Sequence, residues 1–277
     1  MNRPGALYLI PVPISETDPL VVLSPATLEA IRGLRTFIVE SERSAGRFLA
    51  KVLSKEALAD TSFSVLDEHT RNEEIPRLLE RVLEGTSAGL ISEAGCPCVA
   101  DPGSGLVAEA HRRGVRVVPL VGPSSILLAL MASGFDAQRF LFLGYIPAES
   151  TARKETLRRI ERECRLDGIT RIFIETPYRN KTVLGDMLAV LSGDTRLCVA
   201  ASLGGPAERV RSGTVTSWKE TEFELGKEPA VFLIAPGFAS NREKRNSGSR
   251  PAPGRLPANP RRSVRAQNIR GSRGRGA

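Results

Sequence analysis

Three short loops rich in Gly, Pro and Ser are the segments of this sequence best suited to bind a ligand. They span residues 11–19, 92–103 and 121–125, and each follows a short apolar run that is typical of a β-strand. In an open parallel sheet, ligands bind where strands end, so loops at one edge form a binding site. Each loop alone could be a plain turn, but three at successive strand ends favour a site.

These loops do not carry the common nucleotide or metal motifs. Residues 103–108 imitate a dinucleotide fingerprint, but no strand precedes them and no acid follows about twenty positions later. There is no GxxxxGK[ST] sequence. The two histidines, His69 and His111, and the four cysteines lack the spacing of a zinc site, so we expect no bound metal.

The elements around the loops follow the pattern of β-α units. Runs of Val, Ile, Leu and Phe alternate with amphipathic stretches, and apolar residues on both strand faces predict a sheet covered by helices on both sides. The sequence predicts strands at 6–12, 36–40, 87–91, 115–120, 140–143, 171–175, 197–201 and 230–235, helices at 24–33, 72–84 and 150–164, and a hairpin near 204–206.

The pattern restarts near residues 133–134, which indicates a second lobe. The expected fold class is therefore α/β with two lobes, residues 1–123 on a mostly parallel sheet and residues 124–237 on a mixed sheet. Residues 238–277 are dominated by Arg, Ser, Asn, Gly and Pro. This composition cannot bury enough apolar surface to fold, and it predicts a disordered basic tail.

The positive charge is concentrated in that tail. Residues 241–277 hold eleven Lys or Arg and one acid, a net +10, whereas residues 1–240 hold 28 and 30, a net −2. The tail has almost no aromatic side chains to stack on bases, so its contacts with RNA would be nonspecific. No apolar run is long enough for a membrane helix. With no obvious export signal and no need for disulfides, a cytoplasmic protein is expected.

Four segments together resemble a known family. They read SEAGCPCVADPG at 92–103, PLVGPSS at 119–125, FLFLGYIP at 140–147 and IETPYRN at 174–180. In this order they resemble the tetrapyrrole methylase superfamily, nearest its branch of ribosomal RNA small-subunit cytidine 2′-O-methyltransferases. The resemblance implies two α/β lobes, usually in a homodimer, with S-adenosyl-L-methionine bound between the lobes.

The resemblance also implies which residues contact this cofactor. Backbone groups at strand ends can recognise adenine and the methionine zwitterion, and small residues permit close approach. The implied residues are Pro11, Glu93, Ala94, Gly95, Cys96, Ser124 and Ser125 around the first lobe, and Thr176, Pro177, Gly204, Gly205, Pro229 and Ala230 in the second.

Two segments depart from the family pattern. Residues 12–21, VPISETDPLV, lack the usual glycine and asparagine, and residues 39–43, VESER, lack the usual aspartate. Both border the region where a methyl acceptor would enter, so they indicate a divergent member. Three readings stay open: ribose 2′-O-methylation of ribosomal RNA, methylation of a small anionic metabolite such as a tetrapyrrole, and a non-catalytic protein associated with RNA or the ribosomal subunit.

Methyl transfer needs few catalytic side chains, because the main task is to hold the acceptor about 3 to 3.5 Å from the methyl carbon. A hydroxyl acceptor benefits from a general base. Glu40, Glu42 and His69 are the candidates because they follow strands near the site, although each could equally be a solvated surface residue. Arg43 could orient a phosphate or carboxylate, or form a salt bridge at a helix start.

Overall fold

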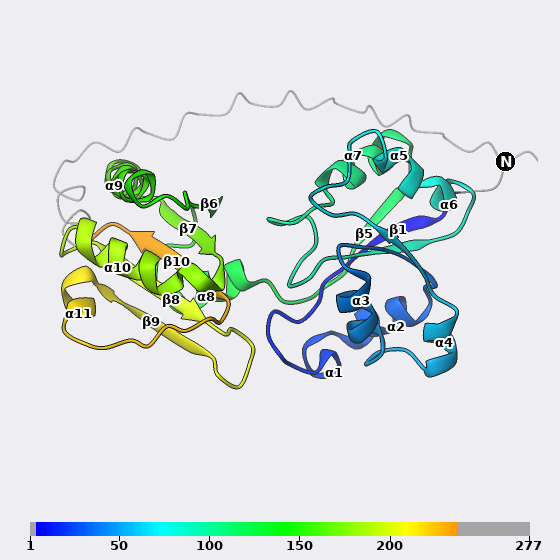
Figure 1. The fold of residues 1–277 in the computed structure, drawn as a ribbon, viewed down its shortest axis with the longest axis horizontal. Helices are drawn as coiled ribbons and strands as arrows, with labels where there is room; N and C mark the ends of the chain where they lie inside the picture. The colour runs from blue at the N-terminus through cyan, green and yellow to red at the C-terminus, as the bar shows by residue number, and fades with distance from the viewer. Residues whose placement is uncertain (1–3, 238–277) are drawn as a thin grey trace, which may run out of the picture. The chain divides into compact units, whose positions relative to one another are not determined.

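The computed structural model describes residues 4–237, which belong to one compact unit and contain two five-stranded sheets. The first sheet has the order β3-β2-β4-β1-β5 and the second the order β6-β7-β10-β8-β9. The strands of the second sheet are labelled in Figure 1. Each sheet has helices on both faces. The α/β fold class predicted from the sequence is confirmed.

All strands of the first sheet are parallel, as predicted. The strand that contains Leu7 pairs with a neighbour on each side, so that Leu7 lies opposite Ala88 on one side and opposite Val117 on the other. The strands are β1 (Ala6–Ile10), β2 (Thr36–Val39), β3 (Ser62–Val65), β4 (Ala88–Ile91) and β5 (Arg116–Pro119). All five strands therefore end at one edge, the carboxyl edge.

Two predicted boundaries in this lobe are wrong. The first strand ends at Ile10 instead of residue 12, because Pro11 has no N–H to continue the ladder. The helix expected over 72–84 is split at Leu79 into two short helices. The first of these helices begins at Ile75, so that Pro76 lies in its first turn. An earlier start would place Pro76 in the helix interior, where a backbone N–H is needed that proline lacks.

Helices cover both faces of the first sheet. Ile31 of α2 and Phe48 of α3 pack with Phe37 on one face, and Leu79 and Leu106 pack with the opposite face. The helices are α1 (Pro19–Val22), α2 (Pro25–Arg32), α3 (Glu42–Leu49), α4 (Lys55–Ala59), α5 (Ile75–Leu78), α6 (Glu80–Leu83) and α7 (Ser104–Arg112). Both faces are therefore removed from water, which supplies the main driving force for this lobe.

The second sheet is mixed, as predicted. Strand β6 is parallel to β7, whereas β10 runs antiparallel to both β7 and β8, and β9 pairs antiparallel with β8. The expected hairpin is the β8-β9 connection. The strands are β6 (Phe140–Tyr145), β7 (Thr170–Glu175), β8 (Arg196–Ala201), β9 (Arg209–Thr214) and β10 (Ala230–Ala235).

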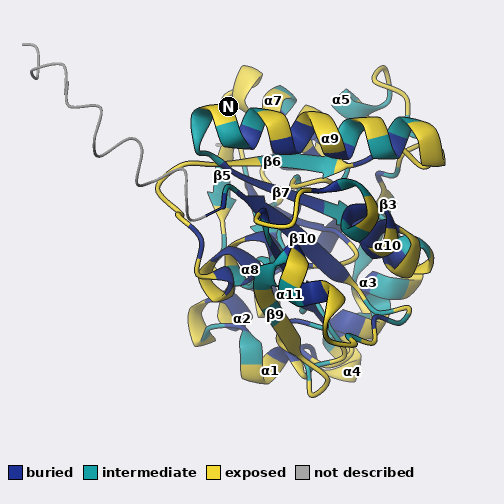
Figure 2. Ribbon diagram, turned by 90° about the vertical axis from the view of Figure 1, so that its left-hand side faces the viewer, coloured by how far each residue is buried: buried dark blue, intermediate teal, exposed yellow. Residues whose placement is uncertain are grey.

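This sheet is also covered on both sides. One core joins Leu157, Met187 and Trp218 with the strands, and a second core packs Ile126 and Leu130 against the other face. Strand β10 is buried along its whole length (Figure 2), and β8 is buried except at its first residue, Arg196. The helices are α8 (Ser125–Ser133), α9 (Ser150–Asp167), the 3-10 turn η1 (Pro177–Arg179), α10 (Asn180–Val190) and α11 (Val215–Lys219).

The predicted division at residues 1–123 and 124–237 stays a prediction, since both sheets belong to the same compact unit. The predicted disordered tail, 238–277, lies outside the described residues. Within residues 4–237, no helix has the length and apolarity to span a bilayer. The same residues contain no cluster of His, Cys, Asp and Glu that could hold a metal ion.

Candidate active site

The three Gly/Pro/Ser loops do meet, because their strands are neighbours in the order β4-β1-β5. The backbones of Val12 and Gly95 exchange two hydrogen bonds of 2.9 and 3.2 Å. The Cys96 thiol donates to the Pro123 carbonyl at 3.3 Å. The loops after β1, β4 and β5 are thus tied to one another at the carboxyl edge of the first sheet.

Two glycines allow this close approach. A Cβ atom at Gly122 would lie 2.2 Å from Cγ of Pro11, so only glycine fits between the first and third loops. Gly95 has a φ of 71°, a left-handed conformation that glycine adopts without strain. Pro11, Gly95 and Cys96, which the family resemblance assigned to the cofactor, therefore lie side by side.

The second-lobe residues implied by the resemblance also lie together. Ala230 begins β10 and sits between Glu175, the end of β7, and Ala201, the end of β8. Thr176-Pro177 directly follows Glu175, and the Ser202 N–H donates to the Pro229 carbonyl at 3.0 Å. One edge of the mixed sheet thus gathers Thr176, Pro177, Gly204, Gly205, Pro229 and Ala230.

Contacts join this edge to the first loop. The Thr17 hydroxyl donates to the Gly204 carbonyl at 2.7 Å. A Cβ atom at Gly205 would lie 2.9 Å from the Ser15 hydroxyl oxygen. Ile14 packs against the core on one face of the second sheet. The loops of both lobes are therefore in contact and form one candidate site.

Backbone strain is concentrated in the same loops. In residues 4–237, three residues other than glycine have positive φ, namely Cys98, Ala100 and Ser202. The first two lie in the loop after β4 and the third begins the β8-β9 turn. Such conformations cost on the order of 1–3 kcal/mol each and cluster at functional sites.

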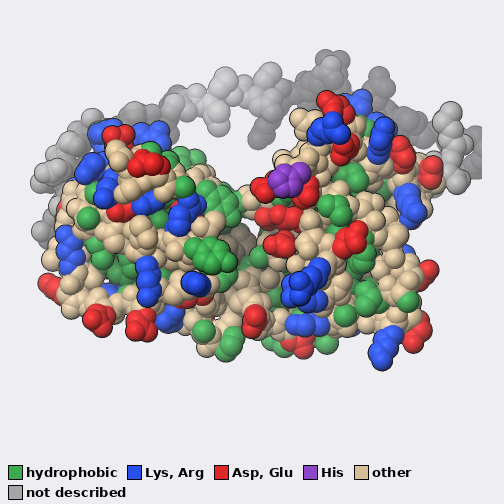
Figure 3. Space-filling view, in the orientation of Figure 1, with side chains coloured by type: hydrophobic (Ala, Val, Ile, Leu, Met, Phe, Trp, Pro, Cys, Tyr) green, Lys and Arg blue, Asp and Glu red, His purple; other side chains and the backbone are tan. Residues whose placement is uncertain are grey.

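Carboxylates line the first-lobe side of the site. The Glu93 N–H donates to Oε2 of Glu40 at 3.3 Å, and the Ser44 hydroxyl donates to Oε1 of Glu93 at 3.1 Å. Burial raises the pKa of Glu40. Burial, followed by the nearby charge of Glu40, raises the pKa of Asp101 to about 6. Acidic side chains gather beside a histidine on the surface of this lobe in Figure 3.

Asp101 and Tyr145 lie at the candidate site, and the sequence did not point to either of them. Asp101 lies in the loop after β4, close enough to Glu40 and Glu93 for their charges to raise its pKa. The pKa of the Tyr145 hydroxyl is raised by burial and by the charges of Asp101 and Glu175, one from each lobe. The signal was available, since Asp101 lies inside the segment 92–103, but only its neighbours were assigned a role.

The three predicted catalytic residues are not brought together equally. Glu40 is half-buried at the end of β2 and is bonded to the loop after β4. Glu42 is exposed in the first turn of α3. His69 has 83% of its side chain exposed, and its Nε2 lies 3.7 Å from the Glu68 carboxylate. Their catalytic roles stay predictions, but the geometry favours Glu40 over the other two.

The site has groups that suit a polar ligand such as S-adenosylmethionine. Among the buried oxygens of residues 4–237 that have no hydrogen-bond partner is Oε2 of Glu175, at the end of β7. Ser124, the N-cap of α8, makes no side-chain capping bond. The first N–H groups of a helix have no intrahelical acceptor and attract a carboxylate. The donors and acceptors present therefore fit the methionine and ribose groups of the cofactor.

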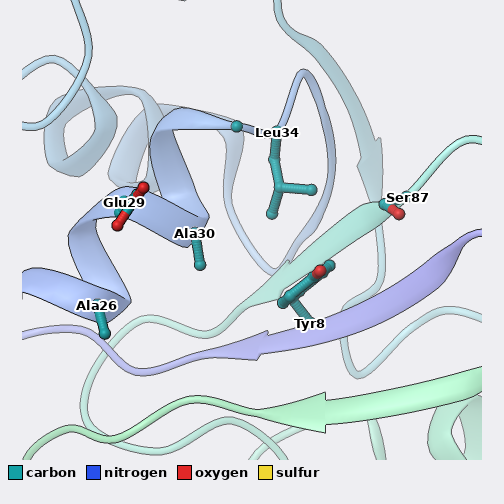
Figure 4. A pocket seen from close by; sticks show the side chains of 7 residues that line it. Tyr8, Ala26, Glu29, Ala30, Leu34 and Ser87 are labelled. Carbon is teal, nitrogen blue, oxygen red and sulfur yellow. The ribbon is translucent and has the colours of Figure 1, made fainter.

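A separate hollow of about 390 Å³ lies elsewhere on the first lobe. Tyr8, Glu29, Leu34 and Ser87 line it, together with the small residues Ala26, Ala30 and Gly33 (Figure 4). Ser87 precedes β4, so this hollow lies near the amino end of that strand. It shares no residue with the loops at the carboxyl edge and is not part of the candidate site.

Several known proteins are similar to this chain in sequence or in fold. Residues 6–218 match the family of tetrapyrrole (corrin/porphyrin) methylases. The chain is 35% identical over 236 residues to "Ribosomal RNA small subunit methyltransferase I" of Vibrio cholerae, covering 84% of this chain and 78% of that protein. The protein of the same name in Pseudomonas aeruginosa is 32% identical over 234 residues, with 83% and 79% covered.

The crystal structure of the methyltransferase CobJ superposes with a TM-score of 0.56 at 16% identity, covering 84% of this chain and 94% of that one. This likeness shows the fold. The family match spans most of the chain and includes the loops that build the site. The chain belongs to the tetrapyrrole (corrin/porphyrin) methylases and is an S-adenosylmethionine-dependent methyltransferase.

Proposed function

We propose that this methyltransferase modifies a ribose 2′-hydroxyl of small-subunit ribosomal RNA at the site where the two lobes meet. The observation that carries the proposal is Asp101, a partly buried carboxyl group in the loop after β4 with a pKa of about 6. Such a group is mostly ionised at neutral pH and can accept the proton of a hydroxyl acceptor. The names of the relatives in Vibrio cholerae and Pseudomonas aeruginosa support ribosomal RNA as the acceptor.

The cofactor would be held by backbone groups from both lobes. The tied loops after β1, β4 and β5 offer Pro11, Gly95 and Cys96, and α8 offers its amino end at Ser124 and Ser125. The second lobe offers Thr176 and the turn at Gly204 and Gly205. Bound there, the cofactor supplies an electrophilic methyl group.

The side chains then have two tasks: they orient the acceptor hydroxyl, and they remove its proton. Asp101 takes the proton that the hydroxyl loses and releases it to solvent afterwards. Glu40 stays close to Asp101, and its negative charge helps to raise the pKa of Asp101. The hydrogen bonds from Gly95 to Val12 and from Cys96 to Pro123 hold the loop that carries Asp101, so the carboxylate is positioned before the acceptor arrives.

The acidic side chains at the carboxyl edge of the first sheet, here called the acidic edge, favour a nucleoside over a polycarboxylate as the methyl acceptor. Glu40, Glu93 and Asp101 would repel the carboxylates of a tetrapyrrole directly at the reacting centre. A ribose and its base are uncharged, so they can enter this region while the phosphates stay outside it. This argument favours RNA over the small anionic metabolite that the sequence left open.

We further propose that the enzyme acts as a homodimer in the cytoplasm. Apolar side chains are exposed on and beside α8, with Val121 at 76%, Leu127 at 51% and Met131 at 77% exposure. Exposed apolar patches mark interaction sites. In a dimer with two-fold symmetry, the patches of the two copies would pack against each other and both be buried. Sedimentation of the full chain against a Leu127→Glu, Met131→Glu variant tests the dimer.

Ser125→Trp tests the cofactor site. The indole should block the start of α8 and weaken S-adenosylmethionine binding by about tenfold or more, measured by calorimetry. Ser150→Trp is the matched control, because Ser150 is the exposed first residue of α9. Equal affinity in both variants would show that the cofactor binds elsewhere.

Transfer of a labelled methyl group tests the acceptor. Small ribosomal subunits and their deproteinised RNA are incubated with the full chain and labelled cofactor, and the labelled nucleoside is identified by mass spectrometry. We expect label on one ribose. Label on a base, or on no RNA at all while a tetrapyrrole is labelled, would overturn the proposed acceptor.

A further inference from the structure

Two exposed arginines on α3 have no acidic partner. Within residues 4–237, Arg43 forms no hydrogen bond or ion pair, and Arg47 donates only to the Ser44 hydroxyl, at 3.3 Å. Guanidinium groups are strong, directional donors for carboxylates and phosphates. Both arginines therefore have donors free for a ligand.

These arginines lie beside the candidate site. Ser44, which accepts from Arg47, donates in turn to Glu93, and the Glu93 N–H donates to Glu40. α3 starts at Glu42, three residues after β2 ends at Val39, so Arg43 is in the turn of the helix nearest the carboxyl edge. Although several carboxylates are near, none forms an ion pair with either arginine in the described part of the chain.

The outer face of α3 is shaped for an extended anion. Arg43 and Arg47 are four residues apart and share this face with Gly46 and Ala50. A Cβ atom at Gly46 would meet nothing within 4 Å, so the space over the helix is open there. The opposite face is buried through Ala45, Phe48 and Leu49. Two guanidinium groups thus project beside a low surface of small residues.

An RNA acceptor creates a charge problem that this face can solve. The ribose enters a region lined by Glu40, Glu93 and Asp101, which repels the phosphates on either side of it. Those phosphates must be held nearby by cations. We propose that Arg43 and Arg47 bind the RNA phosphodiester backbone next to the methylated nucleotide and so place its ribose at the acidic edge.

This inference rests on the proposed function, and it makes Arg43 and Arg47 positioning residues for the acceptor. The test compares Arg43→Gln, Arg47→Gln with a matched double variant, Arg77→Gln, Arg81→Gln. The control pair has the same spacing and is exposed on the same lobe. Arg81 donates to the Ser62 hydroxyl at the start of β3, which places it at the opposite edge of the sheet.

Binding of a fluorescein-labelled single-stranded RNA of twelve nucleotides is measured by anisotropy at several salt concentrations. Each lost phosphate contact lowers the slope of log affinity against log salt by about 0.7, so the Arg43/Arg47 variant should lose about 1.4. The Arg77/Arg81 variant should keep the wild-type slope. Both variants should bind S-adenosylmethionine as the wild type does.

Methyl transfer to ribosomal RNA gives a second readout. The Arg43/Arg47 variant should show a KM for RNA raised by about tenfold with kcat little changed, since lost uniform binding raises KM. Equal losses in both double variants would mean that only overall charge matters, and unchanged RNA binding would mean that α3 does not contact RNA. Either result overturns the inference.

Failure of the proposed function is distinguishable. If the wild type transfers no methyl group to ribosomal RNA, the proposed acceptor is wrong. The difference in salt slope between the two double variants, measured without any transfer, then still decides whether α3 binds an RNA backbone.

Discussion

The carboxylates of the two sheets differ in how their charge is balanced. At the carboxyl edge of the first sheet, Glu40 and Asp101 have raised pKa values, in both cases mainly because burial disfavours the charged form. Around the second sheet the shifts go the other way. Backbone N–H groups of Ala152 and Thr151 lower the pKa of Glu149, and the Arg165 guanidinium lowers that of Asp194.

This difference separates chemistry from stability. Paired carboxylates in the second lobe favour the folded state, since their ionised form gains hydrogen bonds on folding. The unpaired carboxyl groups of the first lobe oppose folding when they ionise, and the strained residues Cys98 and Ala100 lie in the same loop. Groups that weaken the fold are retained where proton transfer is proposed, which is common at active sites.

The largest effect on stability should come from breaking the buried pair in the second lobe. Nε of Arg153, whose side chain is 3% exposed, donates to Oδ2 of Asp186 at 2.8 Å. Arg153→Met leaves Asp186 buried with only Lys154, 3.4 Å away, as a partner. We expect a loss of about 3 kcal/mol in the free energy of unfolding, measured by urea denaturation.

A loss below about 0.5 kcal/mol would show that Lys154 replaces the arginine. The matched control is Arg71→Met, which removes an exposed partner of Glu74 and should cost little.

Asp101→Asn should have the largest effect on activity. Removing a general base typically lowers the rate by about 100-fold or more, and kcat/KM should fall accordingly. The wild-type rate should decline as pH drops through about 6, the pKa of Asp101, because the protonated carboxyl group cannot accept a proton. The variant should lack this decline.

The same variant should be more stable than the wild type at alkaline pH. The pKa of Asp101 is raised from 3.8 to about 6 in the folded state, so its ionisation destabilises the fold progressively as pH rises from 3.8 to about 6. Asparagine carries no charge, so we expect a gain of about 1 kcal/mol at pH 8 and none below pH 4. A variant that is active but less stable would contradict both roles.

Much of the fold could be predicted from the sequence. The alternation of apolar runs and helical stretches predicted the parallel first sheet and the mixed second sheet. This prediction was possible because the periodicities of strands and helices are visible in the local spacing of apolar residues. The errors arose where backbone chemistry overrides periodicity. Pro11 ends β1 early, and Pro76 lies in the first turn of a helix that starts later than expected and divides at Leu79.

The candidate site was predicted only in its backbone part. The loop positions follow from strand ends, so Pro11 and Gly95 could be expected to lie close together, whereas Gly204 was assigned to the site only by the family resemblance. The environment of a side chain depends on tertiary packing, which spacing does not reveal. For that reason Glu40 and His69 were equivalent candidates on the sequence alone, and Asp101 was not among them. Only the structure shows which carboxyl group is partly buried beside another.

The smallest expected effects distinguish Glu40 from His69. Both follow strands of the first sheet, and both should retain cofactor affinity when replaced, because neither lies in the loops assigned to the cofactor. Glu40→Gln keeps the size of the side chain but removes a charge next to Asp101. We expect methyl transfer to fall by about tenfold, as for a group that supports the base without replacing it.

The pH profile makes this prediction sharper. The charge of Glu40 raises the pKa of Asp101, so the neutral amide should move the decline in rate to lower pH. His69 is exposed, and the carboxylates beside it are those of Glu68 and Asp67, so His69→Ala should change the rate by less than about twofold and leave the profile unmoved. If the histidine variant shifts the profile and the Glu40 variant does not, the proton leaves the acceptor through His69, and the acidic edge serves only to exclude phosphate.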